Sequence, residues 1–215
     1  MSNLIRIDAE KPEISVIKNA ARLIKRGSVI VYPTDTVYGL GANALNPEAV
    51  LQIFKIKGRS PNQPLPVAVS GLEMAEKLAF VGDEARKLTA AFWPGALTLV
   101  LRKKPLLPSI VVGGGASVGL RAPNHAVPLM IIREAGLPLV ATSANKHGAP
   151  SPVEAEEAFR QVGDEVDLIL DCGRVGGQPS TIVDLTKTPP LIVRSGPVTR
   201  EMIEKIIGRV ELAHS

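Results

Sequence analysis

Aromatic residues and cysteine are scarce in this sequence of 215 residues. Aromatic residues make up only 3% of the chain, so the core has to consist mainly of Val, Leu, Ile and Ala. The same scarcity disfavours a nucleic-acid interface in which many bases stack on exposed rings. Cys172 is the single cysteine, which excludes a disulfide within the chain and favours a reducing compartment. We interpret Cys172 as a partly buried structural thiol.

Long apolar runs and the common catalytic motifs are also missing. No apolar run reaches the roughly 20 residues that a membrane-spanning helix needs, and charges interrupt the N-terminus before a secretory signal core could form. We therefore expect a cytoplasmic protein with no membrane partner. The histidines, at positions 125, 147 and 214, lack metal-ligand spacing, so no protein metal ligand is predicted. There is no Walker A loop, no GxGxxG after a strand and no convincing Ser-His-Asp set.

The remaining composition is that of an ordinary globular protein, with 45% hydrophobic and 21% charged residues. The net charge of +4 fits an anionic partner such as a nucleotide or RNA. A slightly basic solvated surface explains the same charge equally well. The length and the lack of a convincing linker favour one domain over residues 1–215.

Helical and extended patterns alternate along the chain. Helical spacing predicts helices over 12–27, from Pro47 with Asn46 as N-cap, over 72–78, 83–92 and 127–135, from a capping box at Ser151–Glu154, and over 198–207. Apolar runs predict strands over 29–32, 65–69, 96–101, 118–121, 137–142, 166–170, 181–185 and 191–193. This order predicts an α/β (α+β) fold, and the hairpin-like spacing of the last two strands argues against a purely parallel sheet. The Gly/Pro-rich stretch 105–115 is interpreted as a functional loop.

Small polar residues gather at three predicted strand ends, in the stretches 33–36, 142–145 and 180–181. Strand ends in α/β folds open onto crevices, and hydroxyl and amide groups there can hold the polar ends of a small ligand. Turn chemistry explains any one of these clusters by itself. Because three clusters lie at the ends of three apolar strands, we expect a small-molecule site where they meet.

Cations lie at several element ends. Lys57 and Arg59 flank Gly58 at the end of a predicted helix, where they suit a phosphate or carboxylate clamp or merely complement the helix dipole. Arg121 and Arg194 each follow an apolar run, and their partners are either protein carboxylates or an anionic ligand. The glycines at 113–115 and 176–177 offer backbone amides for phosphate binding.

The ordered set of motifs resembles the YrdC/TsaC family of threonylcarbamoyl-AMP synthases from about residue 13 to residue 207. The motifs are KRGSVIVYPTDTVYGLGANA, FKIKGRSPNQPLPV, FWPGALTLV, VGLRAPNH, TSANKHGAPSP, STIVDL and VRSG. The resemblance implies an open-sided, YrdC/RibB-like domain with a twisted mixed sheet flanked by helices and a deep basic concave cavity. It is closest to the short, stand-alone form, since few residues follow Arg209.

The family implies a nucleotidyltransferase reaction in which L-threonine, bicarbonate and ATP, with Mg²⁺, give threonylcarbamoyl-AMP and pyrophosphate. The product would pass to a tRNA threonylcarbamoyl transferase complex. By motif, the threonine-binding residues would be Thr36, Arg121, the Ala141 backbone and Ser180. The ATP-binding residues would be Lys57, Arg59, Gln63, Ser117, Ser143, Asn145, Ser151 and Arg194, of which Lys57 and Arg59 would be catalytic.

Two positions of this chain depart from the sequence pattern of the family. Many members have Pro where this chain has Ser60, and some long members have a threonine-contacting His where it has Ala68.

The alternative function is a non-catalytic factor that binds double-stranded RNA or tRNA through shape and phosphate contacts. A carbamoyl-phosphate-using relative is disfavoured because its zinc-binding cysteines are missing. Direct RNA contact and a homodimer are left open.

Overall fold

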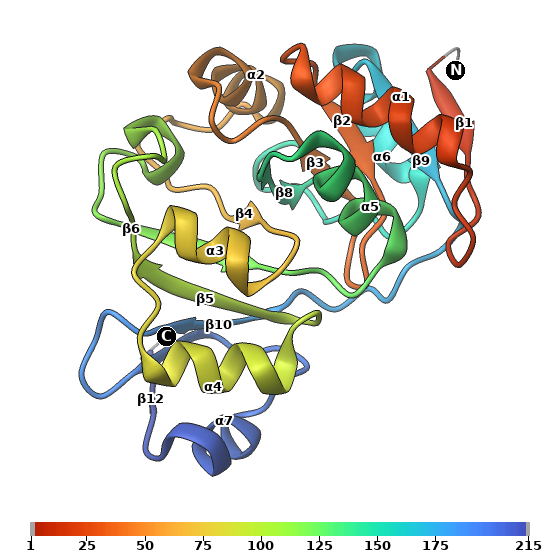
Figure 1. Cartoon of the computed structure of the whole chain (residues 1–215). Helices are drawn as coiled ribbons and strands as arrows, with labels where there is room; N and C mark the ends of the chain where they lie inside the picture. The colour runs from red at the N-terminus through yellow and green to blue at the C-terminus, as the bar shows by residue number, and fades with distance from the viewer. Residues whose placement is uncertain (1–2, 214–215) are drawn as a thin grey trace.

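The computed structural model describes residues 3–213, which form two mixed β-sheets flanked by helices (Figure 1). The prediction of a mixed sheet is confirmed, although hydrogen bonding divides it into two. The five-stranded sheet has the order β1 (Leu4–Arg6), β9 (Leu168–Asp171), β2 (Ile30–Tyr32), β3 (Gly39–Gly41) and β8 (Thr142–Ser143). The seven-stranded sheet has the order β12 (Glu211–Leu212), β11 (Leu191–Arg194), β10 (Thr181–Asp184), β5 (Leu97–Arg102), β6 (Ser117–Arg121), β4 (Val67–Ala68) and β7 (Leu139–Val140).

The chain passes between the two sheets at Ala141. Strand β7 belongs to one sheet and β8 to the other, and only Ala141 separates them. The amide of Ala141 donates to Pro66 O at 2.9 Å, and that of Val140 donates to Ala42 O at 2.9 Å, which ties this crossing to both sheets. The prediction of one continuous strand over 137–142 was therefore wrong, because the chain changes partners within it.

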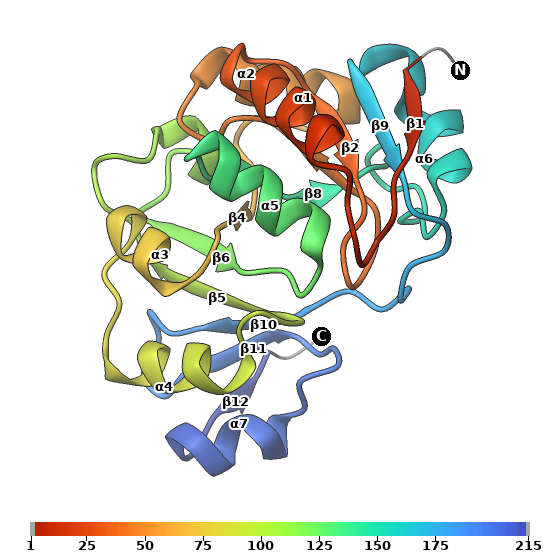
Figure 2. The ribbon, with the colours of Figure 1, turned by 45° about the vertical axis from the view of Figure 1, so that its right-hand side comes forward.

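Helices cover both faces of the five-stranded sheet. Helices α1 (Ile14–Lys25) and α5 (Ala126–Ala135) pack together on one face, where their side chains meet Ile30 and Leu168 (Figure 2). Helices α2 (Pro47–Lys57) and α6 (Ala155–Val162) belong to the larger core that contains Val31 and Ile169. The alternation of Ile30 and Val31 between the two cores follows from the two-residue repeat of a strand.

The remaining helices accompany the seven-stranded sheet. They are α3 (Leu72–Leu78), α4 (Asp83–Phe92) and α7 (Arg200–Ile207), and α4 and α7 pack against each other below that sheet in Figures 1 and 2. The predicted hairpin is present, since β10 and β11 pair antiparallel. Two 3₁₀ helices, η1 (Ser109–Val112) and η2 (Gly163–Glu165), complete the set of elements. Within residues 3–213, none of the helices combines the length and the apolar character needed to cross a membrane.

Two helix boundaries show where sequence rules succeed and fail. Asn46 caps α2 as predicted, since its Oδ1 accepts from the amide of Glu48 at 3.0 Å. The prediction of a capping box at Ser151–Glu154 was wrong, because α6 begins at Ala155 and has no side-chain cap. The carbonyls of Pro152 and Val153 instead accept from the amides of Tyr38 and Val175, both at 2.9 Å, so tertiary contacts hold this segment extended.

The stretch 105–115 supports the structure and does not line the cavity described below. Leu107 and Val111 are fully buried, and Val111 O accepts from the amide of Leu65 at 2.8 Å. Gly113 has a φ of 58°, and a Cβ there would come within 2.3 Å of Asn62 O. The interpretation as a functional loop is therefore not supported by its contacts, which brace the segment that ends at Leu65.

Candidate functional site

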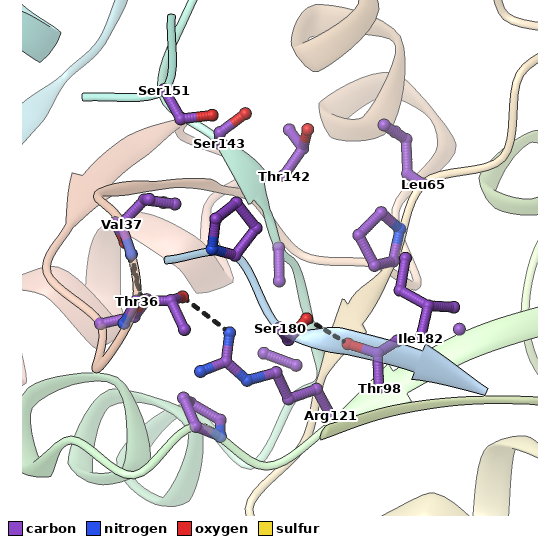
Figure 3. A pocket seen from close by; sticks show the side chains of 18 of the residues that line it. Thr36, Val37, Leu65, Thr98, Arg121, Thr142, Ser143, Ser151, Ser180 and Ile182 are labelled. Atoms are coloured by element: carbon purple, nitrogen blue, oxygen red, sulfur yellow. Dashed lines mark hydrogen bonds between the residues drawn. The ribbon is translucent and has the colours of Figure 1, made fainter. Parts of the chain in front are cut away.

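A cavity of about 430 Å³ lies between the two sheets, a size typical of small-molecule sites. Members of all three predicted polar clusters line it, and they come from the turn after β2, from β8 and from the start of β10. In Figure 3, Thr142, Ser143 and Ser151 lie on one side of the cavity, and Thr98, Arg121 and Ser180 lie on the other. The other lining residues are mainly small or apolar: Tyr32, Thr34, Thr36, Val37, Gly39, Arg59, Pro64, Leu65, Pro66, Ala68, Val100, Gly119, Pro123, Ala141, Pro179, Ile182, Val193 and Arg194.

Of the twelve residues predicted for the site, the structure brings eight to the cavity wall. These are Thr36, Arg59, Arg121, Ala141, Ser143, Ser151, Ser180 and Arg194. The other four do not line it: Lys57, Gln63, Ser117 and Asn145. Gln63 is exposed, and Ser117 lies at the opposite end of β6 from Arg121. Lys57 and Asn145 are buried directly behind Ser143, as described below.

Arg121 projects from the end of β6 towards the turn that follows β2. Its Nε donates to Gly95 O and its Nη1 donates to Thr36 Oγ1, both at 2.9 Å, and the second contact is drawn in Figure 3. Its Nη2 forms an ion pair with Asp35. Each terminal nitrogen carries two N–H groups, so one N–H on each is left over for a ligand. Arg121 therefore has a protein carboxylate as its partner, and one N–H group on each of its terminal nitrogens remains unused.

Arg194 and Thr98 hold Ser180 from two neighbouring strands. Arg194 Nε donates to Ser180 O at 2.9 Å, and Arg194 Nη2 contacts Ser180 Oγ at 3.2 Å. Ser180 Oγ and Thr98 Oγ1 lie 2.8 Å apart (Figure 3). No carboxylate pairs with Arg194 among residues 3–213, and burial followed by the charge of Arg121 lowers the pKa of Arg194. Arg121 and Arg194 thus both line the cavity, and Asp35 is the carboxylate that pairs with Arg121.

Lys57 stabilises the loop that follows β8. Its Nζ donates to Ser143 O at 2.6 Å, and to Asn145 O and Asn145 Oδ1, both at 2.8 Å. The side chain is only 3% exposed, and burial, followed by the charge of Arg59, lowers the pKa of Lys57 to about 8. All three ammonium donors are used, so Lys57 acts on the cavity through the position of Ser143.

Arg59 reaches the cavity because the chain reverses at Gly58. Gly58 ends α2 with a φ of 63°, a left-handed conformation that glycine adopts without strain. Arg59 Nη2 donates to Pro64 O at 2.9 Å, whereas its Nε is buried without a partner among the described residues. Burial lowers the pKa of Arg59. An unpaired guanidinium donor at the wall of a cavity is suited to an anionic ligand.

The turn from Pro33 to Thr36 is fixed by its own hydroxyls and by a glycine from another segment. Thr34 Oγ1 donates to Val37 O at 2.7 Å and lies 3.0 Å from Thr36 Oγ1. A Cβ on Gly176 would come within 2.6 Å of Asp35 O. The predicted role of Gly176 in phosphate binding is therefore replaced by close packing against this turn, since neither Gly176 nor Gly177 lines the cavity.

Sequence reasoning missed Tyr32 and Thr98, and it placed Asp35 in a polar cluster without its ion-pair partner. Tyr32 reads as a strand residue, yet it lines the cavity, and burial raises the pKa of its phenol so that the hydroxyl keeps its proton. The pairing of Asp35 with Arg121 joins positions far apart in the chain, which no local pattern reveals. Cys172 does not line the cavity, and burial raises the pKa of its thiol, which opposes nucleophilic use.

No group of three or more His, Cys, Asp or Glu side chains is arranged to hold a metal ion within residues 3–213. His214 lies outside the described residues.

Comparison with known proteins places these features in a family. The family model Sua5_yciO_yrdC, described as "Telomere recombination", matches residues 22–196. The chain belongs to the Sua5/YciO/YrdC family. This match covers the turn after β2, both arginines that reach Thr36 and Ser180, and the loop held by Lys57.

Relatives with an assigned name align over nearly the whole chain. A threonylcarbamoyl-AMP synthase of Pyrococcus abyssi is 40% identical over 205 residues, which is 94% of this chain. One from Bacillus subtilis is 41% identical over 199 residues, or 91% of the chain. The chain spans only 60% and 58% of the lengths of these two Sua5/YciO/YrdC relatives.

Solved structures of the Sua5/YciO/YrdC family agree with the fold. The crystal structure of P. abyssi Sua5 complexed with L-threonine superimposes with a TM-score of 0.94 at 40% sequence identity. The match covers 97% of this chain and 62% of that one. The prediction of a YrdC-like α/β fold is thus confirmed.

Proposed function

We propose that this chain is an L-threonylcarbamoyladenylate synthase, which condenses L-threonine, bicarbonate and ATP into threonylcarbamoyl-AMP and pyrophosphate. The observation that carries the proposal is the convergence of Arg59, Arg121 and Arg194 on one small cavity whose remaining polar groups are hydroxyls and main-chain groups. The names of the relatives and the L-threonine complex of P. abyssi Sua5 support the same assignment.

The threonine end of the cavity would lie around Arg121. Its two remaining N–H groups suit the α-carboxylate of an amino acid, because a planar guanidinium binds a carboxylate with two parallel hydrogen bonds. Thr36 and Ser180 present hydroxyls beside it, and the chain crossing at Ala141 contributes main-chain atoms. The amine of the bound amino acid would attack the carbon of bicarbonate, so that a C–N bond forms, water leaves and an N-carboxylate results.

The nucleotide end would lie around Arg59, Ser143, Ser151 and Arg194. The guanidinium groups would offset the charge of the phosphates, and the Ser143 and Ser151 hydroxyls would contact the nucleotide. Mg²⁺ would enter bound to ATP, held by phosphates and water, a common mode for this ion that requires no protein cage. We retain Lys57 as a residue required for ATP use, acting through the loop that it holds.

The chemistry requires two anions to approach each other. The N-carboxylate would attack the α-phosphate and expel pyrophosphate, and cations fixed in advance lower the cost of bringing these charges together. Alignment of the two reactants can supply several kcal/mol of the acceleration, with an upper range of about 7–11 kcal/mol. We propose that the adenylate is then handed to a tRNA threonylcarbamoyl transferase.

A purified-protein assay tests the proposal directly. Pyrophosphate release from ATP should require both L-threonine and bicarbonate, and labelled bicarbonate should appear in an adenylate product. Arg59→Ala should abolish release, whereas Arg209→Ala, at an exposed arginine that pairs with Glu211 away from the cavity, should not. Wild-type rates in Arg59→Ala would overturn the assigned site. Salt-sensitive binding of double-stranded RNA without ATP turnover would favour the non-catalytic alternative.

A further inference from the structure

Thr98 is the polar residue that strand β5 places at the cavity wall. Thr98 and Val100 line the cavity, whereas Leu97 and Leu99 are fully buried in the larger hydrophobic core. This alternation follows from the two-residue repeat of a strand. Thr98 is only 4% exposed, so its hydroxyl group needs a partner inside the protein. The identity of that partner shows what the hydroxyl does.

The two branches of the Thr98 side chain point to the strands on either side of β5, which lies between β10 and β6. The hydroxyl oxygen lies 2.8 Å from Oγ of Ser180, the residue directly before β10 (Figure 3). The methyl carbon lies against Gly119 of β6, where an added Cβ would come within 3.2 Å of it. Because Gly119 leaves this space open, the methyl group fits there, and the same staggered conformation directs the hydroxyl to Ser180.

The main chain at Ser180 is held by close packing, so its side chain keeps the main remaining freedom. A Cβ on Gly196 would come within 2.6 Å of Pro179 O and 2.8 Å of the Ser180 carbonyl carbon. Within residues 3–213, the hydrogen-bond partners of Ser180 Oγ are Thr98 Oγ1 and Arg194 Nη2. Thr98 is buried and branched at Cβ, whereas Arg194 is exposed and long. Thr98 is therefore the partner that sets the position of the Ser180 hydroxyl.

Both hydrogen bonds of the Arg194 guanidinium are made to Ser180. Nε donates to the Ser180 carbonyl at 2.9 Å and Nη2 donates to its hydroxyl at 3.2 Å, and the described residues offer the guanidinium no other partner. An exposed arginine keeps one orientation only through such contacts, because ordering its side chain costs rotamer entropy. The orientation of Arg194 thus depends on Ser180.

We propose that Thr98 is a positioning residue, whose hydroxyl fixes the Ser180 side chain and, through it, the guanidinium of Arg194 at the cavity. This inference rests on the proposed function, in which Arg194 offsets the charge of the nucleotide phosphates. A guanidinium that is oriented before the ligand arrives does not have to be ordered on binding, so the nucleotide is bound more tightly.

Two substitutions of Thr98 separate its hydroxyl from its packing. Thr98→Val keeps the branched shape without the hydroxyl, and Thr98→Ser keeps the hydroxyl without the methyl group. In the pyrophosphate assay, Thr98→Val should lower kcat/KM for ATP about 3–10-fold, the effect of one lost hydrogen bond, whereas Thr98→Ser should stay within about 2-fold of the wild type. Equal losses in the two variants would indicate a packing role and overturn the proposal, as would unchanged kinetics in Thr98→Val.

Thr89→Val is the matched control for the loss of a buried threonine hydroxyl. Thr89 is also 4% exposed, and its Oγ1 donates to Arg86 O at 2.9 Å in helix α4. It does not line the cavity, so its replacement should leave kcat/KM for ATP unchanged. A loss in Thr89→Val as large as that in Thr98→Val would show a general effect of hydroxyl removal and overturn the proposal.

A double-mutant cycle with Ser180→Ala tests whether Thr98 acts through Ser180. Calorimetry measures the Kd of an ATP analogue with a methylene group between the α and β phosphates, so the cycle is measurable even where turnover is lost. Adding Thr98→Val to Ser180→Ala should weaken binding by less than about 2-fold, because the group through which Thr98 acts is already absent. Independent losses that multiply would overturn the positioning role.

The failure of this inference is distinguishable from the failure of the proposed function. A wild-type protein that releases no pyrophosphate with L-threonine, bicarbonate and ATP would overturn both. An active wild type with an equally active Thr98→Val variant would overturn the inference alone.

Discussion

Arg121 and Asp35 form an ion pair at the cavity, and their side chains are only 13% and 18% exposed. The same guanidinium also contacts Gly95 O and Thr36 Oγ1. Three fixed contacts hold its plane in one orientation, so the remaining N–H groups meet a ligand without having to be ordered first. This relationship fixes the geometry of the end of the cavity that we propose for threonine.

The shape of the Arg121 side chain should matter as much as its charge. Arg121→Lys keeps the charge but cannot make the three contacts and also present a planar fork. We expect the KM for L-threonine to rise at least about 10-fold, which corresponds to about 1.4 kcal/mol, with a much smaller change for ATP. Steady-state kinetics with each substrate varied in turn measures this. Arg102→Lys, at an exposed position outside the cavity, is the control, and an unchanged threonine KM in Arg121→Lys would refute the role.

Lys57 predicts an unusual dependence of stability on pH. Its pKa is lowered to about 8 from the ordinary 10.5, so between these values the unfolded chain binds a proton that the folded protein releases. Stability therefore gains a contribution as the pH rises through this window. Urea unfolding from pH 7.5 to 10 should show this rise in the wild type and a flatter profile in Lys57→Met. Parallel profiles would indicate an ordinary pKa for Lys57.

Gly41 should be intolerant of even one added carbon. Gly41→Ala places a Cβ within 2.5 Å of Tyr32 Cε1, so the ring must shift inside a packed core. We expect a loss of about 1–3 kcal/mol in the free energy of unfolding. Gly82→Ala is the control, because nothing lies within 4 Å of a Cβ there and its φ is negative. Equal stability of the two variants in urea titrations would show that Tyr32 can move freely.

Local rules predicted the elements whose causes are local. Asn46 and Pro47 mark the start of α2, and the ranges predicted for α3 and α4 match the structure residue for residue. The short strands β1, β3 and β12 were missed. Strand β3 in particular has two glycines in three residues, and it is a strand because it pairs with both β2 and β8.

The location of the candidate site could be predicted from the sequence, but most of the hydrogen bonds within it could not. Clusters of hydroxyls at strand ends pointed to the cavity, because strand ends in α/β folds open onto crevices where ligands bind. Lys57 shows the limit of this reasoning. Its three acceptors belong to Ser143 and Asn145, which only the fold brings next to Lys57. The ammonium group that was expected to bind phosphate therefore donates to atoms of the protein itself.

The main-chain crossing at Ala141 joins the two sheets through bonds from consecutive residues to Pro66 and Ala42. The spacing of the two walls at this point is consequently set by main-chain hydrogen bonds, so we expect replacement of a wall side chain such as Ala68 to leave it unaltered. Under the proposed function, we therefore expect that exchanging wall side chains alone changes the preference for the amino acid without moving the two sheets.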